Sequence, residues 1–164
     1  EFPWLETINP KGDIMKILLI DDSKNHRVAG KAALEAVGHD VRSFAIYSEA
    51  RKAVTSGEKF DAALIDLNMP CEVDPYTASF PKNYLGQEIA IGYPLALSLS
   101  ILGVPFVAVA SDAGHHASPQ NAMLDWLNGT PIVSQFGKIL FMHAPMDSRG
   151  VKDWVRVLTT LTPC

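Results

Sequence analysis

The fold is decided by one stretch of the chain, Asp61-Ala62-Ala63-Leu64-Ile65-Asp66-Leu67-Asn68-Met69-Pro70. Its apolar run ending in Asp66 is typical of a buried parallel strand. Because Pro70 cannot continue a strand ladder and disfavours a helical Met69, we expect the chain to leave the sheet there. Asp66 then lies at the carboxyl edge, where open α/β sheets bind their ligands.

A second pair of carboxylates follows another apolar run. Asp21 and Asp22 come directly after Lys16-Ile17-Leu18-Leu19-Ile20, which predicts the first strand. If this strand lies beside the one that ends in Asp66, the carboxylates converge, and their mutual repulsion favours a hard divalent cation. Taken singly, each aspartate also fits a helix cap or a turn, and this alternative stays open.

The remaining sequence alternates between strand and helix patterns. Further strands are expected at 41–44, 105–110 and 138–143, and helices at 24–37, 48–55, 86–102, 118–127 and 151–161. Strands alternating with helices require right-handed crossovers, and hence a parallel sheet covered on both faces. We expect an α/β, flavodoxin-like (βα)5 three-layer sandwich with the strand order 2-1-3-4-5, in which strand one lies between strands two and three and Asp21, Asp22 and Asp66 are neighbours at the switch point.

Composition limits the possible classes of protein. The 164 residues are 48% hydrophobic and 20% charged, and the net charge of -4 gives no footprint for nucleic acid. Cys71 and Cys164 suggest neither a disulfide framework nor a zinc-type pair, which favours a cytoplasmic location. The uncharged segment 89–111 is long enough to cross a bilayer, but glycines and prolines interrupt it, so we expect a helix followed by a strand and no membrane partner.

The sequence also indicates a domain organisation. Residues 1–14 precede Met15, which reads as a natural start, and we expect them to be a leader or an expression-derived segment. Residues 15–164 are expected to form a single domain. Neither strand nor helix periodicity holds at about 71–88, where we expect an insertion, and loops of this length are usually functional or mobile.

The motifs resemble those of response regulator receiver domains, the CheY-like phosphoacceptor modules of two-component signalling. The resemblance rests on Ile20-Asp21-Asp22-Ser23, on Asp66-Leu67-Asn68-Met69-Pro70 and on the βα repeats from Met15 to about Leu161. It implies that Asp66 is the phosphoacceptor, that Asp22 and Asp66 bind Mg²⁺ with support from Asp21, and that Asn68 contributes its backbone carbonyl. The implied partners are a histidine kinase or phosphotransfer protein and a separate effector protein.

Two departures make the resemblance atypical. Receiver domains end strand four with Ser or Thr, whereas here Ala110 occupies that position and Ser111 follows it. They end strand five with Lys before Pro, whereas here Ala144 precedes Pro145. Ser111 and Lys152 are therefore the candidates for contacting the phosphoryl group, and Lys152 must reach it by a different route.

A second candidate cluster consists of Asp112, His115 and His116, after the fourth strand. Imidazoles with a carboxylate can bind zinc or another transition metal, and His116 can instead donate to a phosphate; a plain solvated loop is the alternative. A serine hydrolase is not supported, since no Gly-x-Ser-x-Gly motif occurs.

The functional hypothesis is a single-domain receiver that undergoes self-phosphotransfer on Asp66 and is otherwise not an enzyme. The alternative is a pseudo-receiver that acts as a protein-interaction module without phosphorylation. A third hypothesis is an enzyme of metal-assisted phosphoester chemistry that uses the acidic cluster with His115 and His116.

Overall fold

The computed structural model describes residues 14–73, 82–127 and 129–162. One main sheet has the order β2-β1-β3-β6-β8-β7. Its strands are β1 (Lys16–Ile20), β2 (Asp40–Phe44), β3 (Ala62–Asp66), β6 (Phe106–Ser111), β7 (Ile132–Ser134) and β8 (Gly137–His143). All neighbours from β2 to β8 are parallel, which confirms the predicted strand order 2-1-3-4-5.

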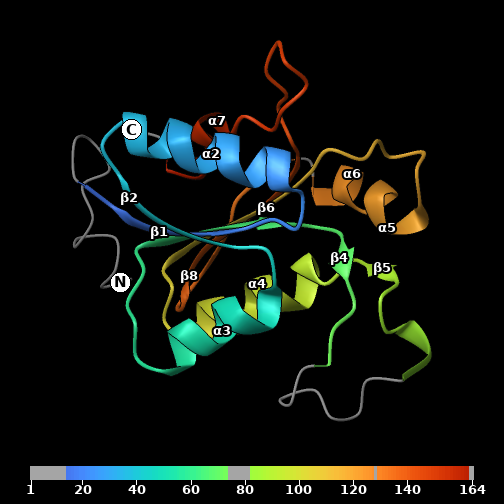
Figure 1. Ribbon diagram of the computed structural model, residues 1–164, viewed down its shortest axis with the longest axis horizontal. Coiled ribbons are helices and arrows are strands. Elements are labelled where there is room, and N and C mark those ends of the chain that lie inside the picture. The colour runs from blue at the N-terminus through green and yellow to red at the C-terminus, as the bar shows by residue number, and fades with distance from the viewer. Residues whose placement is uncertain (1–13, 74–81, 128, 163–164) are drawn as a thin grey trace.

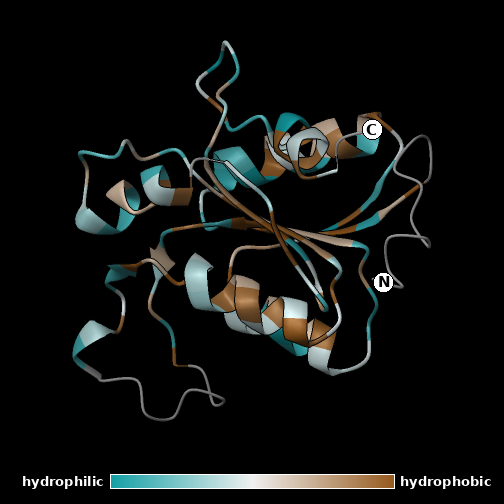
Figure 2. Ribbon diagram, turned by 180° about the vertical axis from the view of Figure 1, so that it is seen from behind, coloured by the Kyte–Doolittle hydropathy of each residue, from teal (hydrophilic) through white to brown (hydrophobic). Residues whose placement is uncertain are grey.

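Helices cover both faces of the sheet, as the α/β prediction requires (Figure 1). On one face lie α2 (Lys24–Ala36) and α7 (Trp154–Leu161), and on the other lie α3 (Tyr47–Thr55) and α4 (Gly92–Ile101). Alternate residues of each strand enter two separate cores, so that Leu18 packs with the α3 and α4 side and Leu19 with Trp154 of α7. Every residue of β3 and β6 is buried. In Figure 2 these hydrophobic strands run between helices that carry hydrophilic residues.

The sheet has a sixth strand that the sequence analysis missed. The strand β7 pairs antiparallel with β8 at the edge, with Ile132 opposite Ile139. Two of its residues, Ile132 and Val133, are exposed, so the segment lacks the buried apolar pattern by which the other strands were found. The hairpin closes at Gly137, where φ is +146° and a Cβ would lie 2.1 Å from the carbonyl oxygen of Pro105.

Three predicted helices are shorter in the structure. The helix expected at 86–102 begins only at Gly92, because β5 (Glu88–Ile89) pairs antiparallel with β4 (Met69–Pro70) after the chain has left the main sheet. The helix expected at 118–127 is divided into α5 (Pro119–Ala122) and α6 (Leu124–Leu127). The last helix begins at Trp154, since Lys152 still bridges to Met146.

The two segments that raised questions of organisation are partly outside the described residues. Residues 1–13 of the expected leader and residues 74–81 of the expected insertion lie outside the described residues. The described part of the insertion includes a 3-10 turn, η2 (Lys82–Tyr84). The uncharged segment 89–111 forms α4 and β6 with short connections, in line with the predicted helix followed by a strand. Across the described ranges, no helix is long and apolar enough to span a membrane.

Candidate functional site

The predicted acidic residues meet at the carboxyl edge of the sheet. The register between β1 and β3 places Ile20 beside Ile65, so that Asp21 and Asp66 follow at neighbouring strand ends. One carboxylate oxygen from each of Asp21, Asp22 and Asp66 lies within 4.8 Å of the others. Asp21 and Asp66 are buried and Asp22 is half-buried. An all-oxygen donor set of this kind fits a hard cation such as Mg²⁺.

Lys152 enters the same cluster. Its Nζ donates to Asp66 Oδ1 at 2.6 Å and to Asp21 Oδ2 at 3.2 Å, and it lies 3.4 Å from Asp112 Oδ1. The side chain comes from the base of a hairpin between β8 and α7, which Asp153 N closes by donating to the Pro145 carbonyl at 2.8 Å. This hairpin projects beyond the helices in Figure 1. Lys152 thus reaches the carboxylates from beyond strand β8, and not from its last residue.

Burial and charge shift the pKa values in opposite directions here. Burial raises the pKa of Asp66 to about 7, against the effect of Lys152 and together with that of Asp21. Burial also raises the pKa of Asp21, again against Lys152. For Lys152, burial acts to lower the pKa, but the Asp66 and Asp21 carboxylates outweigh it and the pKa is raised. The cluster therefore keeps a charged ammonium beside a surplus of carboxylates, and an added cation would relieve the remaining repulsion.

Two residues of helix α2 hold this cluster in place. His26 Nδ1 accepts from the Lys152 backbone N–H at 3.2 Å, and its Nε2 lies 3.1 Å from Asp112 Oδ2. Arg27 Nη1 donates to the carbonyls of Asp21 at 2.7 Å and Asp22 at 3.1 Å. Sequence reasoning missed both residues, although their position in the first turn after Asp22 was a usable signal.

A second set of polar side chains lies on the other side of Asp66. The strand β6 continues one residue past Ala110, so Ser111 is buried at the strand end without a bulge. Ser111 Oγ donates to Asn121 Oδ1 at 3.0 Å, and Asn68 Nδ2 donates to the same oxygen at 2.9 Å. Asn121, in α5, was not predicted, because its placement depends on how that short helix folds back over the strand ends.

These groups surround an open space. A cavity of about 270 Å³ is lined by Asp66, Asn68, Asp112 and Asn121, among others. It combines a buried carboxylate, a nearby ammonium and amide donors. Chemically, such a cavity can hold a tetrahedral oxyanion next to Asp66 and a hard cation among the carboxylates.

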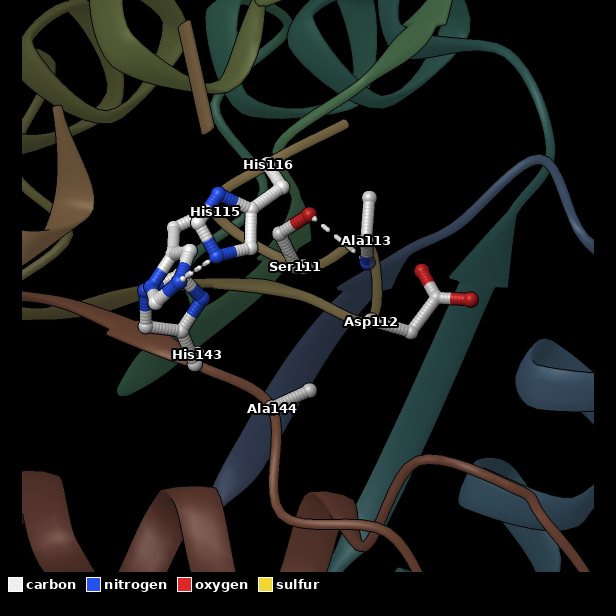
Figure 3. Close-up of a pocket in the computed structure, with 8 residues that line it drawn as sticks. Ser111, Asp112, Ala113, His115, His116, His143 and Ala144 are labelled. Atoms are coloured by element: carbon white, nitrogen blue, oxygen red, sulfur yellow. Dashed lines mark hydrogen bonds between the residues drawn. The ribbon is translucent and has the colours of Figure 1, made fainter. Parts of the chain in front are cut away.

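The structure separates Asp112 from the two histidines with which it was grouped. Asp112 faces His26 and Lys152, whereas the His115 and His116 rings contact each other with Nε2 atoms 2.8 Å apart. Figure 3 shows the Asp112 carboxylate pointing away from His115 and His116, and a third histidine, His143, lies next to these two. His115 Nδ1 lies 3.3 Å from Asp125, a residue that sequence reasoning missed.

Comparisons with known proteins bear on the fold. No protein-family model matches the chain, and no curated protein matches it. A response regulator receiver protein from Sinorhizobium medicae has a similar structure, with 15% identity, a TM-score of 0.58 and coverage of 92% of this chain and 93% of that one. The chemotaxis protein CheY4 of Vibrio cholerae aligns with 17% identity and a TM-score of 0.54, covering 91% of this chain and 99% of its own.

A third solved structure carries bound ions. TrrA, a response regulator protein from Thermotoga maritima in complex with Mg²⁺ and BeF, aligns with 16% identity and a TM-score of 0.52 over 82% of this chain and 90% of its own. At such identities a structural likeness speaks for the fold alone. The chain therefore has the fold of response regulator receiver domains, which confirms the resemblance found in the sequence at this level.

Proposed function

We propose that this chain, which folds as a receiver domain, accepts a phosphoryl group on Asp66 in a Mg²⁺-dependent reaction and signals in the cytoplasm through a separate partner. The donor would be a histidine kinase or phosphotransfer protein. One observation carries the proposal: Asp66 is buried beside Asp21 and Asp22 and is contacted by the Lys152 ammonium at 2.6 Å.

The residues fit in-line phosphoryl transfer. An Asp66 carboxylate oxygen attacks phosphorus, the bond from phosphorus to the leaving group breaks, and an acyl phosphate forms on Asp66. Asp21, Asp22, Asp66 and the Asn68 carbonyl would hold Mg²⁺, which supplies neutralising charge for the transferring oxygens. Ser111 and Lys152 would donate to those oxygens.

Lys152 supplies the cation that the end of the fifth parallel strand does not. Ala144 precedes Pro145 at that strand end, yet the hairpin that follows brings an ammonium to the Asp66 carboxylate. The same contact supports a role as a switch, because a new phosphoryl group would compete with Asp21 for Lys152 and shift the hairpin that carries it. An effector that binds the hairpin would sense the change.

The expected insertion at 71–88 supports a closed site. Its last residue, Glu88, lies in β5 and lines the cavity beside Asp66. Because β5 is held by pairing with β4, directly after the Asp66 loop, we propose that β5 forms one wall of the phosphorylation site.

A phosphorylation-independent interaction module is the second candidate. The observation in its favour is that burial raises the pKa of Asp66 to about 7, so a large share of Asp66 is protonated at neutral pH when no metal is bound. A protonated carboxyl group is a poor nucleophile. Metal binding would have to remove this proton before transfer.

Incubation with acetyl phosphate and Mg²⁺ separates the two candidates. Intact mass spectrometry should show the gain of one phosphoryl group, absent when Mg²⁺ is chelated and absent in Asp66→Asn. Asp40→Asn, which alters an exposed aspartate at the opposite end of the sheet, is the matched control and should be phosphorylated like the wild type. No mass gain in the wild type would reject the phosphoacceptor role and favour the interaction module.

A further inference from the structure

A second cluster of ligating side chains lies outside the acidic cavity. His115 follows β6, Asp125 lies in α6, and His143 is the last residue of β8. His143 Nε2 lies 2.8 Å from Asp125 Oδ1, and His115 Nδ1 lies 3.3 Å from Asp125 Oδ2. One ligand atom from each residue lies within 4.8 Å of the other two. Segments far apart in the sequence therefore direct two imidazoles and a carboxylate to one point.

The spacing and chemistry of these atoms fit one class of ion. Zinc bonds of about 2.0–2.1 Å to imidazole place neighbouring donor atoms about 3.3 Å apart in a tetrahedron. The separations from His143 Nε2 to Asp125 Oδ1, 2.8 Å, and from His115 Nδ1 to Asp125 Oδ2, 3.3 Å, are of the same order. Nitrogen donors suit Zn²⁺ and its transition-metal neighbours, whereas Mg²⁺ prefers oxygen. The cluster therefore selects a different ion from the acidic cavity.

The surroundings of the cluster also suit a bound metal. A histidine ligand usually donates its second ring N–H to an acceptor, which fixes the ring. His115 has such a neighbour, because its Nε2 lies 2.8 Å from His116 Nε2. The ligand side chains are between 39% and 50% exposed, so an ion can enter from solvent.

Space for a further ligand lies on the same side. A cavity of about 270 Å³ is lined by two of the three ligands, His115 and His143, and by other residues that include Ser111, Asp112 and His116 (Figure 3). Three protein ligands with one open position are typical of zinc sites that bind an exchangeable fourth ligand, whereas structural zinc sites have four protein ligands. A water molecule or a carboxylate or imidazole of another molecule would complete the tetrahedron.

We propose that His115, Asp125 and His143 form a binding site for one divalent transition-metal ion of the zinc type, distinct from the Asp66 cavity. Bound metal fastens α6 to the end of β8 and to the loop after β6. His143 pairs in register with Ser111, whose Oγ is hydrogen-bonded to Asn68 and Asn121 of the Asp66 cavity. Metal binding therefore orders the segment beside the cavity, whether or not Asp66 is phosphorylated.

Cobalt titration of the full chain tests the site, with excess Mg²⁺ present to occupy oxygen-only positions. Co²⁺ bound by nitrogen and oxygen in a tetrahedron absorbs visible light. Trp126 is 91% exposed and directly follows Asp125, so a nearby paramagnetic ion should also quench its fluorescence. We expect saturation at one equivalent, with affinity reduced at least about tenfold in Asp125→Asn and in His143→Gln.

Matched controls replace another acidic residue and another histidine, both distant from the cluster. Glu35→Gln in α2 and His39→Gln near the start of β2 should bind Co²⁺ like the wild type. Absence of saturable binding in the wild type, or unchanged binding in both ligand variants, would overturn the proposal. NMR of the wild-type histidine rings tests the site without any variant. Zn²⁺ should shift the His115 and His143 signals and leave the His39 signals unchanged. Shifts at His39 without shifts at His115 and His143 would also overturn the proposal.

Discussion

At the residue scale, Lys152 determines the charge balance of the Asp66 cavity. Its Nζ lies between Asp66 and Asp21, and the residue is only 3% exposed. The ammonium also lies 5.4 Å from the centre of the Trp154 ring, whose electron-rich face favours a cation. Loss of this single side chain would leave two buried carboxylates without a cationic partner.

Lys152→Met should therefore destabilise the protein by about 3–5 kcal/mol at pH 8, where the carboxylates must stay charged. The cost should be smaller at pH 5, because protonation can then neutralise them, and excess Mg²⁺ should restore part of the loss at pH 8. Urea unfolding measures this. Lys31→Met, which removes an exposed lysine paired with Glu35, is the control and should cost about 0.5 kcal/mol or less; equal costs for the two variants would contradict the role of Lys152.

Asp66 itself gives a prediction about pH. Its pKa is raised from 3.8 to about 7 in the folded protein, so the native state binds this proton more tightly than the unfolded state. The stabilisation that comes from tighter binding of this proton by the native state is fully present below about pH 4. It is lost as the pH rises to about 7. Without divalent ions, the wild-type free energy of unfolding should fall over this range by up to about 4 kcal/mol relative to Asp66→Asn. If the free energy of unfolding of the wild type instead rises over this range relative to that of Asp66→Asn, Lys152 lowers the pKa of Asp66 below its value in the unfolded chain.

The sequence was sufficient to predict the positions of site residues that directly follow a strand. Asp21, Asp22 and Asp66 could be brought together because parallel strands end at one edge, and Ser111 and Lys152 were singled out from the departures in the motif. Asn121 and Asp125 could not be found in this way, since their positions depend on how two short helices fold back. His26 was missed although its place in the first turn after Asp22 was a usable signal.

At the scale of elements, the contact between α2 and α7 lies next to the segment that carries Lys152. A Cβ built on Gly30 would lie 2.3 Å from Trp154 Cδ1, so α2 can approach α7 this closely only with glycine. Trp154 follows Lys152 by two residues and is fully buried. Glycine inside a helix is otherwise unfavourable, which indicates that packing determines the residue at this position.

Gly30→Ala should therefore destabilise the protein by about 1–2 kcal/mol, because overpacking outweighs the gain in helix propensity. Thermal or urea unfolding measures the effect. Gly114→Ala, where an added Cβ meets nothing within 4 Å, should be nearly neutral. In a Trp154→Leu background the cost of Gly30→Ala should shrink; an unchanged cost would place the strain somewhere other than the contact with Trp154.

The helices show where hydrophobic periodicity in the sequence is sufficient to predict the bounds of a helix and where it is not. The α2 and α3 bounds were predicted to within a residue or so, because each helix has a clear end and one apolar side. The predicted start of α4 was wrong by six residues, since Glu88 and Ile89 pair with β4 and the helix begins only at Gly92. Pairing between distant segments has no local signature of this kind.

At the scale of the whole molecule, the order of the strands brings the chemistry together. Since β1 lies between β2 and β3, the acidic ends of β1 and β3 are neighbours, and β6 adds Ser111 from the other side. Alternating strand and helix patterns made the fold class predictable from the sequence, and the order 2-1-3-4-5 is the one that brings the acidic strand ends together. The edge strand β7 was not predicted because two of its residues are exposed, and the cluster of His115, Asp125 and His143 was not predictable because it joins segments far apart in the sequence.

The central claim is that Asp66 is the residue that receives the phosphoryl group. Borohydride reduces an aspartyl phosphate to homoserine, so peptide mass spectrometry after treatment with acetyl phosphate and Mg²⁺ locates the acceptor. The expected result is homoserine at position 66, dependent on Mg²⁺ and not found at Asp21, Asp22 or Asp112. Homoserine at another position, or at none, would contradict the claim.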